Sequence, residues 1–227
     1  NPSLFPNTRF SLEPVQPNGV PLWGTGESKA GVEHAGKVVD VYLLMLREIG
    51  LIKERFDAAR ASAHSQGREF ADMGALTSVT VRKTRAEAEK AFYALFETTG
   101  VDLLRSKLEE VVARRSKGEQ TLASYRAPDA QRQEWVDYIL KGQLPPLESL
   151  RLENSLFAGM SAWSSLDIFG TGSSAAYLVG DADGIAQNVE AYHQQAGLTA
   201  LIMSGWPLID EARHVAELLI PKLNEIG

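Results

Sequence analysis

The sequence contains no cysteine and only four histidines in 227 residues. The absence of cysteine excludes disulfide bonds, thiolate metal ligands and a cysteine nucleophile. No two histidines have the H-x-x-x-H or H-E-x-x-H spacing of a metal site, and each lies in a segment predicted to be helical. We therefore expect no metal ion. We interpret the four histidines as surface or capping residues, namely His34, His64, His193 and His214.

Positively charged residues are also fewer than negatively charged ones. Lys and Arg number 23 against 29 Asp and Glu, which gives a net charge of −6. No basic cluster of the kind that follows a phosphate backbone is present, so we expect no nucleic-acid partner. No apolar run is long enough to span a bilayer and no signal-peptide pattern is found, so we expect no membrane partner and a cytoplasmic location. The first residue is Asn1 rather than methionine, which indicates that upstream residues were removed or not captured.

The composition that remains is typical of a globular protein, with 44% apolar and 23% charged residues. The length suits one domain or one and a half. The clearest structural pattern lies between residues 178 and 227. Asp181 is placed to cap a helix in which Ile185, Val189 and Tyr192 recur on one face. Gly197 fits the left-handed position that closes such a helix.

The end of the chain continues this pattern. Residues 198–203 form an almost wholly apolar run without alternation, which predicts a strand buried on both faces. After a turn of small residues, a second helix is predicted whose apolar face contains Ala212, Val215, Ala216 and Leu219. Helix, buried strand and helix in this order indicate a parallel α/β fold, in which ligands bind at the carboxyl ends of the strands.

Earlier parts of the chain show the same alternation. Residues 1–20 are rich in Pro, Asn and Gly and are predicted to form a loop or linker. Ser28 is the expected N-cap of one helix, a second helix is expected over residues 47–66, and Thr84 opens a third through a capping box with Glu87. Buried strands are predicted, besides 198–203, at residues 20–23, 38–44 and 75–82.

Residues 101–165 interrupt the alternation. This segment is helical in pattern, is charged and contains no convincing strand, so we interpret it as an insertion that extends, with the loop after it, over residues 101–174. The charged residues between 105 and 119 are interpreted as a solvated helix face. A TIM barrel needs eight strands. Four strands with helices between them therefore predict a half barrel over residues 21–227.

The turn formed by Thr25, Gly26 and Ser28 is the first candidate binding site. It follows a predicted strand and opens a helix, so its backbone N–H groups and the serine hydroxyl can bind an anion such as phosphate. The alternative is an ordinary strand-to-helix turn with a serine cap, because the spacing matches neither a P-loop nor G-x-G-x-x-G.

Two further segments are candidates. The Gly/Ser loop at residues 169–174 can fold over a substrate as a lid or serve only as a mobile connector. At the end of the last strand, the turn that contains Ser204 and Trp206 can wall a planar ligand, or the tryptophan can seal the core. No catalytic residue is nominated, because no Ser-His-Asp arrangement can be inferred and the acidic residues are too scattered to form an evident pair.

Four stretches of the sequence carry a family resemblance. In chain order they are PVQP at residues 14–17 with TGESKAG, then VVDVYLL, then MGALTSVTVRKT, and finally LVGD with LIMSGWPLIDEARHVAELLIPKL. Together they resemble the bacterial luciferase-like flavin-dependent monooxygenases, with the alkanesulfonate monooxygenases as the nearest branch. The resemblance extends from about Pro14 to Leu223. It implies strands five to eight of a TIM barrel, with a helical insertion before the last strand and without the first four strands.

The resemblance also implies a chemistry. In that family, reduced flavin reacts with oxygen in a dry pocket at the carboxyl-end face of the barrel. It implies reduced FMN as the cofactor, with F420 as the second choice, a small organic substrate and a separate flavin reductase. Contacts to the flavin phosphate are expected at Thr25, Gly26 and Ser28. The expected active-site wall, which includes part of the family's mobile loop at residues 166–174, contains Ser78, Thr171, Gly172, Ser204 and Trp206.

The chain departs from the alkanesulfonate branch where that branch binds its substrate. Leu76 and Ser78 replace an arginine and a histidine, Thr171 or a neighbour replaces the loop arginine, and Trp206 replaces a tyrosine. A sulfonate needs positive charge or strong donors. We therefore expect that the chain does not oxidise alkanesulfonates.

Two hypotheses follow from these patterns. The first is a flavin-dependent monooxygenase, seen as its C-terminal half barrel or as a shortened relative. The second is a non-catalytic truncated barrel that binds flavin or a partner chain. An isolated half barrel has open strand edges, and such edges recruit another chain. We therefore expect a homo-oligomer if the chain ends here, and instability if it is a fragment without its other half.

Overall fold

The structure is a computed structural model that describes residues 15–16, 19–160, 165–171 and 176–226. Its strands are β1 (Trp23–Thr25), β2 (Val41–Met45), β3 (Asp72–Val81), β4 (Arg151–Glu153), β5 (Leu156–Ala158), β6 (Ala176–Gly180) and β7 (Ala200–Ser204). Its α-helices are α1 (Lys29–Val38), α2 (Ile49–Ser65), α3 (Arg85–Thr99), α4 (Val101–Arg115), α5 (Ala130–Leu140), α6 (Ala182–Ala196), α7 (Leu208–His214) and α8 (Ile220–Ile226). A 3₁₀ turn spans Leu147–Leu150, and a π-helical turn, Val215–Leu219, joins α7 to α8.

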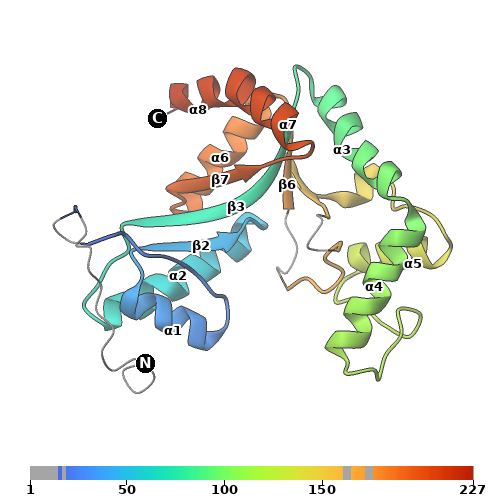
Figure 1. Cartoon of the computed structure of the whole chain (residues 1–227), viewed down its shortest axis with the longest axis horizontal. Helices are drawn as coiled ribbons and strands as arrows, with labels where there is room; N and C mark the ends of the chain where they lie inside the picture. Colours follow the sequence, from blue (N-terminus) through green and yellow to red (C-terminus); the bar gives the residue numbers. More distant parts are fainter. Residues whose placement is uncertain (1–14, 17–18, 161–164, 172–175, 227) are drawn as a thin grey trace.

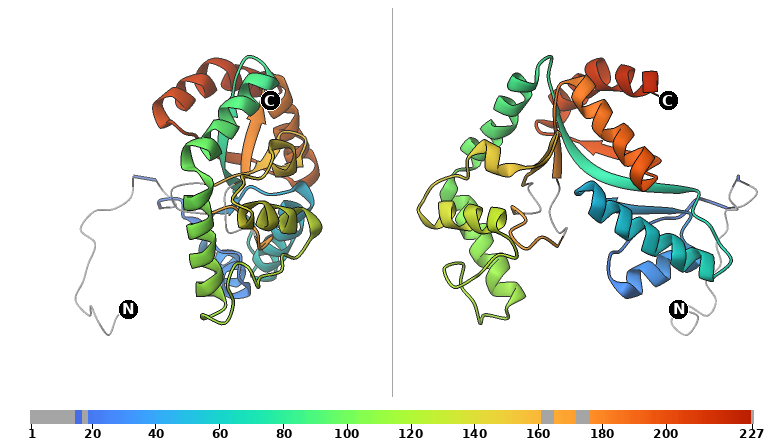
Figure 2. Two further views of the ribbon diagram at one scale, coloured as in Figure 1. Left: turned by 90° about the vertical axis from the view of Figure 1, so that its right-hand side faces the viewer. Right: turned by 180° about the vertical axis from the view of Figure 1, so that it is seen from behind.

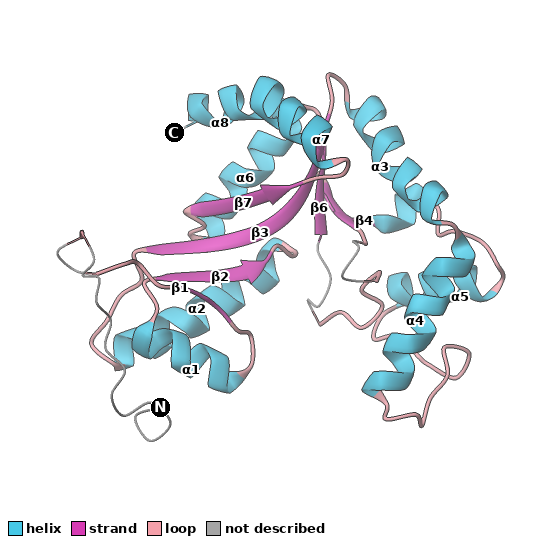
Figure 3. Ribbon diagram, viewed as in Figure 1, coloured by secondary structure: helices cyan, strands magenta, loops and turns pink. Residues whose placement is uncertain are grey.

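The strands form one curled sheet in the order β1-β2-β3-β6-β5-β4, with β7 also paired to β3 (Figure 3). β1, β2, β3, β6 and β7 are parallel along their pairings, whereas β4 and β5 are antiparallel. The long strand β3 pairs with β2 through Leu76, with β7 through Ser78, and with β6 from Ser78 to Val81. One strand therefore holds two groups of strands together.

The local signals that begin and end helices are confirmed. Ser28 caps α1 by accepting a hydrogen bond from the backbone of the first turn, and Asp181 does the same for α6. Thr84 and Glu87 form the reciprocal capping box of α3. Gly197 ends α6 in the left-handed conformation, at φ 74°. These contacts involve residues at most four apart, which explains why the sequence predicts them.

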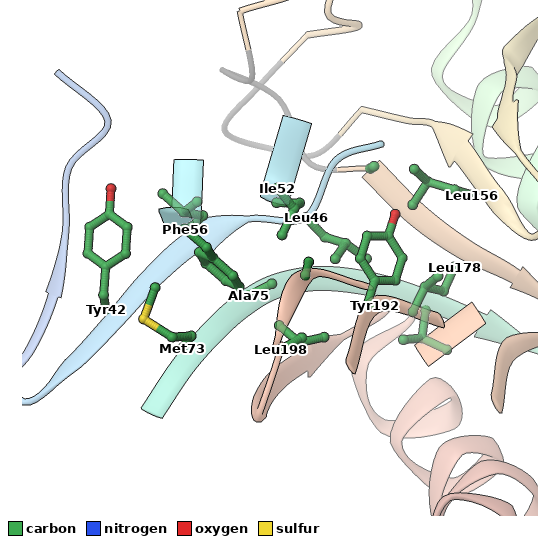
Figure 4. Packing of buried hydrophobic residues seen from close by; sticks show 14 of the residues in the cluster. Tyr42, Leu46, Ile52, Phe56, Met73, Ala75, Leu156, Leu178, Tyr192 and Leu198 are labelled. Atoms are coloured by element: carbon green, nitrogen blue, oxygen red, sulfur yellow. The ribbon is translucent and has the colours of Figure 1, made fainter. Parts of the chain in front are cut away.

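The first group of elements, which we call the barrel lobe, comprises β1–β3, β7, α1, α2 and α6–α8 (Figure 1). Its core lies between the sheet and the helices α2 and α6, and the side chains that meet there include Tyr42, Phe56, Met73 and Tyr192 (Figure 4). The Tyr42 and Phe56 rings meet edge to face with centroids 6.4 Å apart. Among the described residues, no helix covers the opposite, concave face of these strands (Figure 1).

The second group, the insertion lobe, comprises α3, α4, α5 and β4–β6 (Figure 2). Its separate core is aromatic, because the Phe92 ring packs against Phe96, Phe157 and Tyr177 with centroids 5.3–5.5 Å apart. Trp135 is fully buried in the same core. The expectation that the insertion contains no strand is therefore wrong, because β4 and β5 form a short antiparallel pair. β6, a segment for which the sequence analysis predicted no structure, is also a strand.

Alternation along β5 and β6 connects the two cores. Leu156 and Leu178 point into the core of the barrel lobe, whereas Phe157 and Tyr177 point into the core of the insertion lobe. Both faces of these strands are thus covered, which explains why their sequence is apolar without alternation.

Other expectations need correction. β1 begins three residues later than expected and Trp23 is 53% exposed, while β7, expected to be buried on both faces, has Ile202 36% exposed. Both side chains are accessible because the concave face is open in the described structure. In α7, Ala212 is exposed and Glu211 is buried instead, since this glutamate pairs with Arg82.

Candidate functional site

The carboxyl ends of β1, β2, β3 and β7 meet on one side of the barrel lobe, which we call the mouth. After β1, the chain turns through Gly26 into α1, and the backbones of Gly26 and Gly31 approach so closely that a Cβ on Gly31 would lie 3.0 Å from the Gly26 carbonyl carbon. The Tyr42 hydroxyl fixes the turn by donating to the Gly26 carbonyl oxygen at 2.8 Å. The Ser28 hydroxyl accepts from the Gly31 N–H at 3.1 Å. The result is a tight, glycine-lined helix N-terminus.

A chain of ion pairs lies between this turn and the insertion lobe. Arg55 donates to the Glu27 carboxylate at 2.7 Å, and Arg132 reaches Glu48 at 3.3 Å. Burial raises the pKa of Glu27, an effect opposed by the nearby Arg55 guanidinium. Glu27 and Glu48 belong to the barrel lobe, whereas Arg132 belongs to the insertion lobe. Charge therefore lines the side of the mouth at the ends of β1 and β2.

Arg47 and Asp167 form the most buried pair in this chain of charges. Their side chains are 5% and 4% exposed, and Arg47 Nη2 lies 3.4 Å from a carboxylate oxygen of Asp167. Burial lowers the pKa of Arg47, and the neighbouring carboxylate of Asp167 opposes that shift. Arg47 is the second residue after β2, and Asp167 lies in the segment after β5. The pair thus holds residues 165–171 against the mouth.

The other side of the mouth is lined by hydroxyl groups. Ser78 on β3 and Ser204 on β7 bring their hydroxyl oxygens to 3.2 Å from each other. Tyr177, in the neighbouring strand β6, donates its hydroxyl to the Met160 carbonyl oxygen at 2.7 Å, and burial raises the pKa of this tyrosine. Ser78 is paired in register with Tyr177 on one neighbour and with Ser204 on the other. Two predicted site residues are therefore brought together across the sheet.

Trp206 borders a cavity of about 640 Å³ between the turn after β7 and the helices α3 and α4. The turn is held in place by Glu211, whose carboxylate accepts hydrogen bonds from both terminal nitrogens of Arg82, one of them at 3.0 Å. A Cβ added to Gly205 would lie 2.5 Å from the Glu211 Cβ, so only glycine fits between strand and helix here. The alternative of a sealed core tryptophan does not apply, because Trp206 is half-buried and lines the cavity.

The model of the luciferase-like monooxygenase family matches residues 3–199 of the chain. The chain belongs to this family. The family resemblance carried by the four sequence stretches is thereby confirmed.

Three solved structures of similar fold are longer than this chain. A riboflavin lyase crystallised with modified FMN and riboflavin is 17% identical, with a TM-score of 0.61. The match covers 91% of this chain and 43% of the lyase. A long-chain alkane monooxygenase is also 17% identical, with a TM-score of 0.61 and coverages of 90% and 41%. EDTA monooxygenase from a Chelativorans species is 18% identical, with a TM-score of 0.58 and coverages of 94% and 48%. The chain thus spans less than half the length of these luciferase-like structures, and at these identities the likeness is one of fold.

The predicted site residues of this luciferase-like chain fall into three places. Thr25, Gly26 and Ser28 form the turn after β1, and Ser78, Ser204 and Trp206 lie at the ends of β3 and β7. Thr171 lies apart from both groups, because its hydroxyl accepts hydrogen bonds from the Arg115 guanidinium at 3.1 Å, on the insertion lobe. Gly172 lies outside the described residues.

Arg115 is one of the residues that the sequence analysis did not single out. Its guanidinium also stacks over the Phe169 ring at 4.0 Å, although residues 105–119 were interpreted as a solvated helix face. No local signal distinguishes it from its charged neighbours on α4. Arg47 was detectable in principle, because it is the first charged residue after a predicted strand.

Within the described residues, no group of three or more His, Asp or Glu side chains is arranged to hold a metal ion. In the same residues, no helix combines the length and apolar character needed to cross a bilayer.

Proposed function

We propose that the chain forms strands five to eight of a luciferase-like barrel and contributes its half of the active site of a flavin-dependent monooxygenase. The observation that carries this proposal is the tight turn at Gly26, Ser28 and Gly31, which lies at the same mouth as the Trp206 cavity. Residues 1–20 are proposed as the linker before this unit, and residues 101–174 as its insertion and active-site loop.

The turn fits a phosphate group. The first N–H groups of a helix have no intrahelical partner, and the helix dipole favours negative charge there. The close approach of Gly26 and Gly31 leaves no side chain between a ligand and these N–H groups. The Ser28 hydroxyl, which accepts from Gly31, still has its own proton to donate. We therefore propose Thr25, Gly26 and Ser28 as contacts of the phosphate of FMN, with F420 as the second choice.

The remaining residues at the mouth suit the part of the site where flavin and substrate would react. When bound, reduced flavin supplies the two electrons and the reaction with oxygen that insert one oxygen atom into a small organic substrate. Trp206 offers an aromatic wall and excludes water from one side. Ser78 and Ser204 can orient a polar atom of flavin or substrate through their hydroxyls. We propose a separate flavin reductase as the source of the reduced cofactor.

Alkanesulfonates are not the proposed substrates. Leu76 and Ser78 provide no positive charge on β3, and Arg82, the residue directly after this strand, is engaged by Glu211. The proposal therefore retains a small organic substrate other than an alkanesulfonate.

One observation favours the alternative of a binding module that needs a partner chain. In the part of the chain that the structure describes, β1 and β7 each pair with one strand, so one edge of each is open. Trp23 and Ile202 are exposed beside these edges. Open apolar edges recruit further strands, and a homo-oligomer is our proposal for how this surface is covered.

The test is a titration of the full chain with FMN and with riboflavin, oxidised and reduced, while the oligomer mass is followed by light scattering. We expect a defined oligomer that binds FMN at least about tenfold more tightly than riboflavin, since a charge-assisted hydrogen bond contributes about 1.5–3 kcal/mol. Gly31→Ala should remove this preference, because its Cβ pushes against the Gly26 backbone.

Gly50→Ala is the matched control. It introduces the same methyl group near the start of α2, where nothing lies within 4 Å, and should bind FMN like the unchanged chain. Equal binding of FMN and riboflavin, or normal binding by Gly31→Ala, would show that this turn does not hold the phosphate. A defined oligomer that binds no flavin would favour the non-catalytic alternative.

A further inference from the structure

The cavity beside Trp206 has mostly apolar walls. Its volume of about 640 Å³ lies within the roughly 300–1,000 Å³ of typical small-molecule sites. Helix α3 supplies one wall, and the turn after β7 supplies the facing one. The apolar and aromatic residues that line it are Ala91, Ala94, Leu95, Leu103, Met160, Tyr177, Trp206 and Pro207.

Two cationic side chains also line this cavity, and they differ in what they contact. Arg82 gives both terminal nitrogens to the buried carboxylate of Glu211, so its charge is compensated within the protein. Lys107 on α4 is half-buried and forms no ion pair or hydrogen bond with any other described residue. Among the described residues that line this cavity, Lys107 therefore carries the one positive charge that no carboxylate compensates.

An unpaired ammonium next to apolar walls selects for a particular kind of ligand. An apolar molecule gains free energy by leaving water for these walls. A negatively charged end group that enters with it loses hydration and needs a partner, which Lys107 supplies. A neutral polar end group gains far less from the same ammonium.

We propose that this cavity binds an apolar organic molecule with one carboxylate end group, such as a medium-chain fatty acid, and that Lys107 binds the carboxylate. If the proposed monooxygenase function holds, this molecule is the substrate class of the reaction. Lys107 then determines specificity by fixing which end of the molecule lies away from the mouth.

Octanoate and 1-octanol are the probes, because they share a hydrocarbon chain and differ in the charge of the end group. Calorimetric titration of the full chain should give octanoate binding about tenfold tighter than octanol, as expected for a hydrogen bond to a charged group. Lys107→Gln should weaken octanoate about tenfold and leave octanol unchanged. Lys90→Gln, which removes the same charge from the exposed face of α3, should behave like the unchanged chain.

Ala94→Phe tests the place of binding. It fills the cavity from α3 and should weaken both probes. Equal binding of octanoate and octanol, a preference that survives Lys107→Gln, or full binding by Ala94→Phe would each overturn the inference. The flavin titration is separate: flavin binding without an octanoate preference removes only this inference, whereas an octanoate preference without flavin binding removes only the proposed function.

Discussion

The two lobes differ in how completely they bury their apolar residues. The insertion lobe encloses an aromatic core around Phe92 and Trp135, and its one exposed large apolar side chain among the described residues is Leu103, which lines the cavity. The barrel lobe leaves apolar side chains exposed on β1, β7, α7 and α8, for example Trp23 and Ile209. The insertion lobe thus buries its apolar side chains within its own core, whereas the barrel lobe leaves an apolar surface exposed. This contrast is what an insertion on a half barrel predicts.

The largest expected effect comes from removing a buried aromatic ring from one core and measuring the stability of both lobes. Phe92→Ala in the insertion lobe and Phe56→Ala in the barrel lobe should each lower the free energy of unfolding by about 3–5 kcal/mol, because each ring is fully buried. Since β5 and β6 contribute side chains to both cores, we expect both lobes to unfold together. Urea titration gives the free energy, and hydrogen exchange in α5 and α6 reports the two lobes separately.

Exchange that accelerates only in the mutated lobe would contradict this expectation and show two independent folding units. Phe70→Ala is a milder control, since Phe70 stacks on Tyr42 in the barrel lobe but is only partly buried.

The second prediction concerns the clamp between β3 and α7. Glu211→Ala should cost about 3 kcal/mol, because it leaves the partly buried guanidinium of Arg82 without its carboxylate. Asp210→Ala is the matched control: its carboxylate is 58% exposed and pairs with Arg213 at the surface, so its loss should be nearly neutral. The measurement is urea unfolding, together with the fluorescence of Trp206 in the adjacent turn. Equal effects of the two substitutions would mean that the clamp is not a source of stability.

The smallest expected effect is a pH dependence at the junction of the lobes. Glu153 of the insertion lobe accepts the Ile49 N–H, at the start of α2 in the barrel lobe, at 3.1 Å. Burial raises the pKa of Glu153 above its ordinary value of 4.5. The stability contributed by its protonation is therefore present below pH 4.5 and is lost as the pH rises through the raised folded-state value.

Glu153→Gln keeps an acceptor oxygen for Ile49 and removes the ionisation. Relative to the unchanged chain, this variant should gain stability as the pH rises from 4 to 7. Glu134→Gln, at an exposed position on α5, should show no such change. Parallel stability curves for Glu153→Gln and the unchanged chain would contradict the burial of this carboxylate. The measurement is urea unfolding at several pH values.

The two lobes also differ in how far they could be predicted. Ser28 and Asp181 begin helices of the barrel lobe and Thr84 begins α3 of the insertion lobe, and each was recognisable because a cap involves neighbouring residues. β4 and β5 of the insertion lobe, each three residues long, have too few positions to show a period, so no sequence pattern indicated them.

At the site, Ser204 and Trp206 follow a predicted strand, and in parallel folds ligands bind at that end. Lys107 and Arg115 were not distinguishable from other charges on α4. The position of Lys107 in the cavity wall and that of Arg115 over the Phe169 ring depend on how the whole helix packs.

The sequence by itself determined the α/β class, the family and the position of the glycine turn before α1, because these depend on patterns within a few consecutive residues. Only the tertiary structure decided that β3 joins two cores, that Arg82 is compensated by Glu211 while Lys107 is not, and that Ser78 meets Ser204. These contacts join residues far apart in the chain, Ser78 and Ser204 by 126 positions. Burial and charge compensation at such distances are set by packing, which no local pattern encodes.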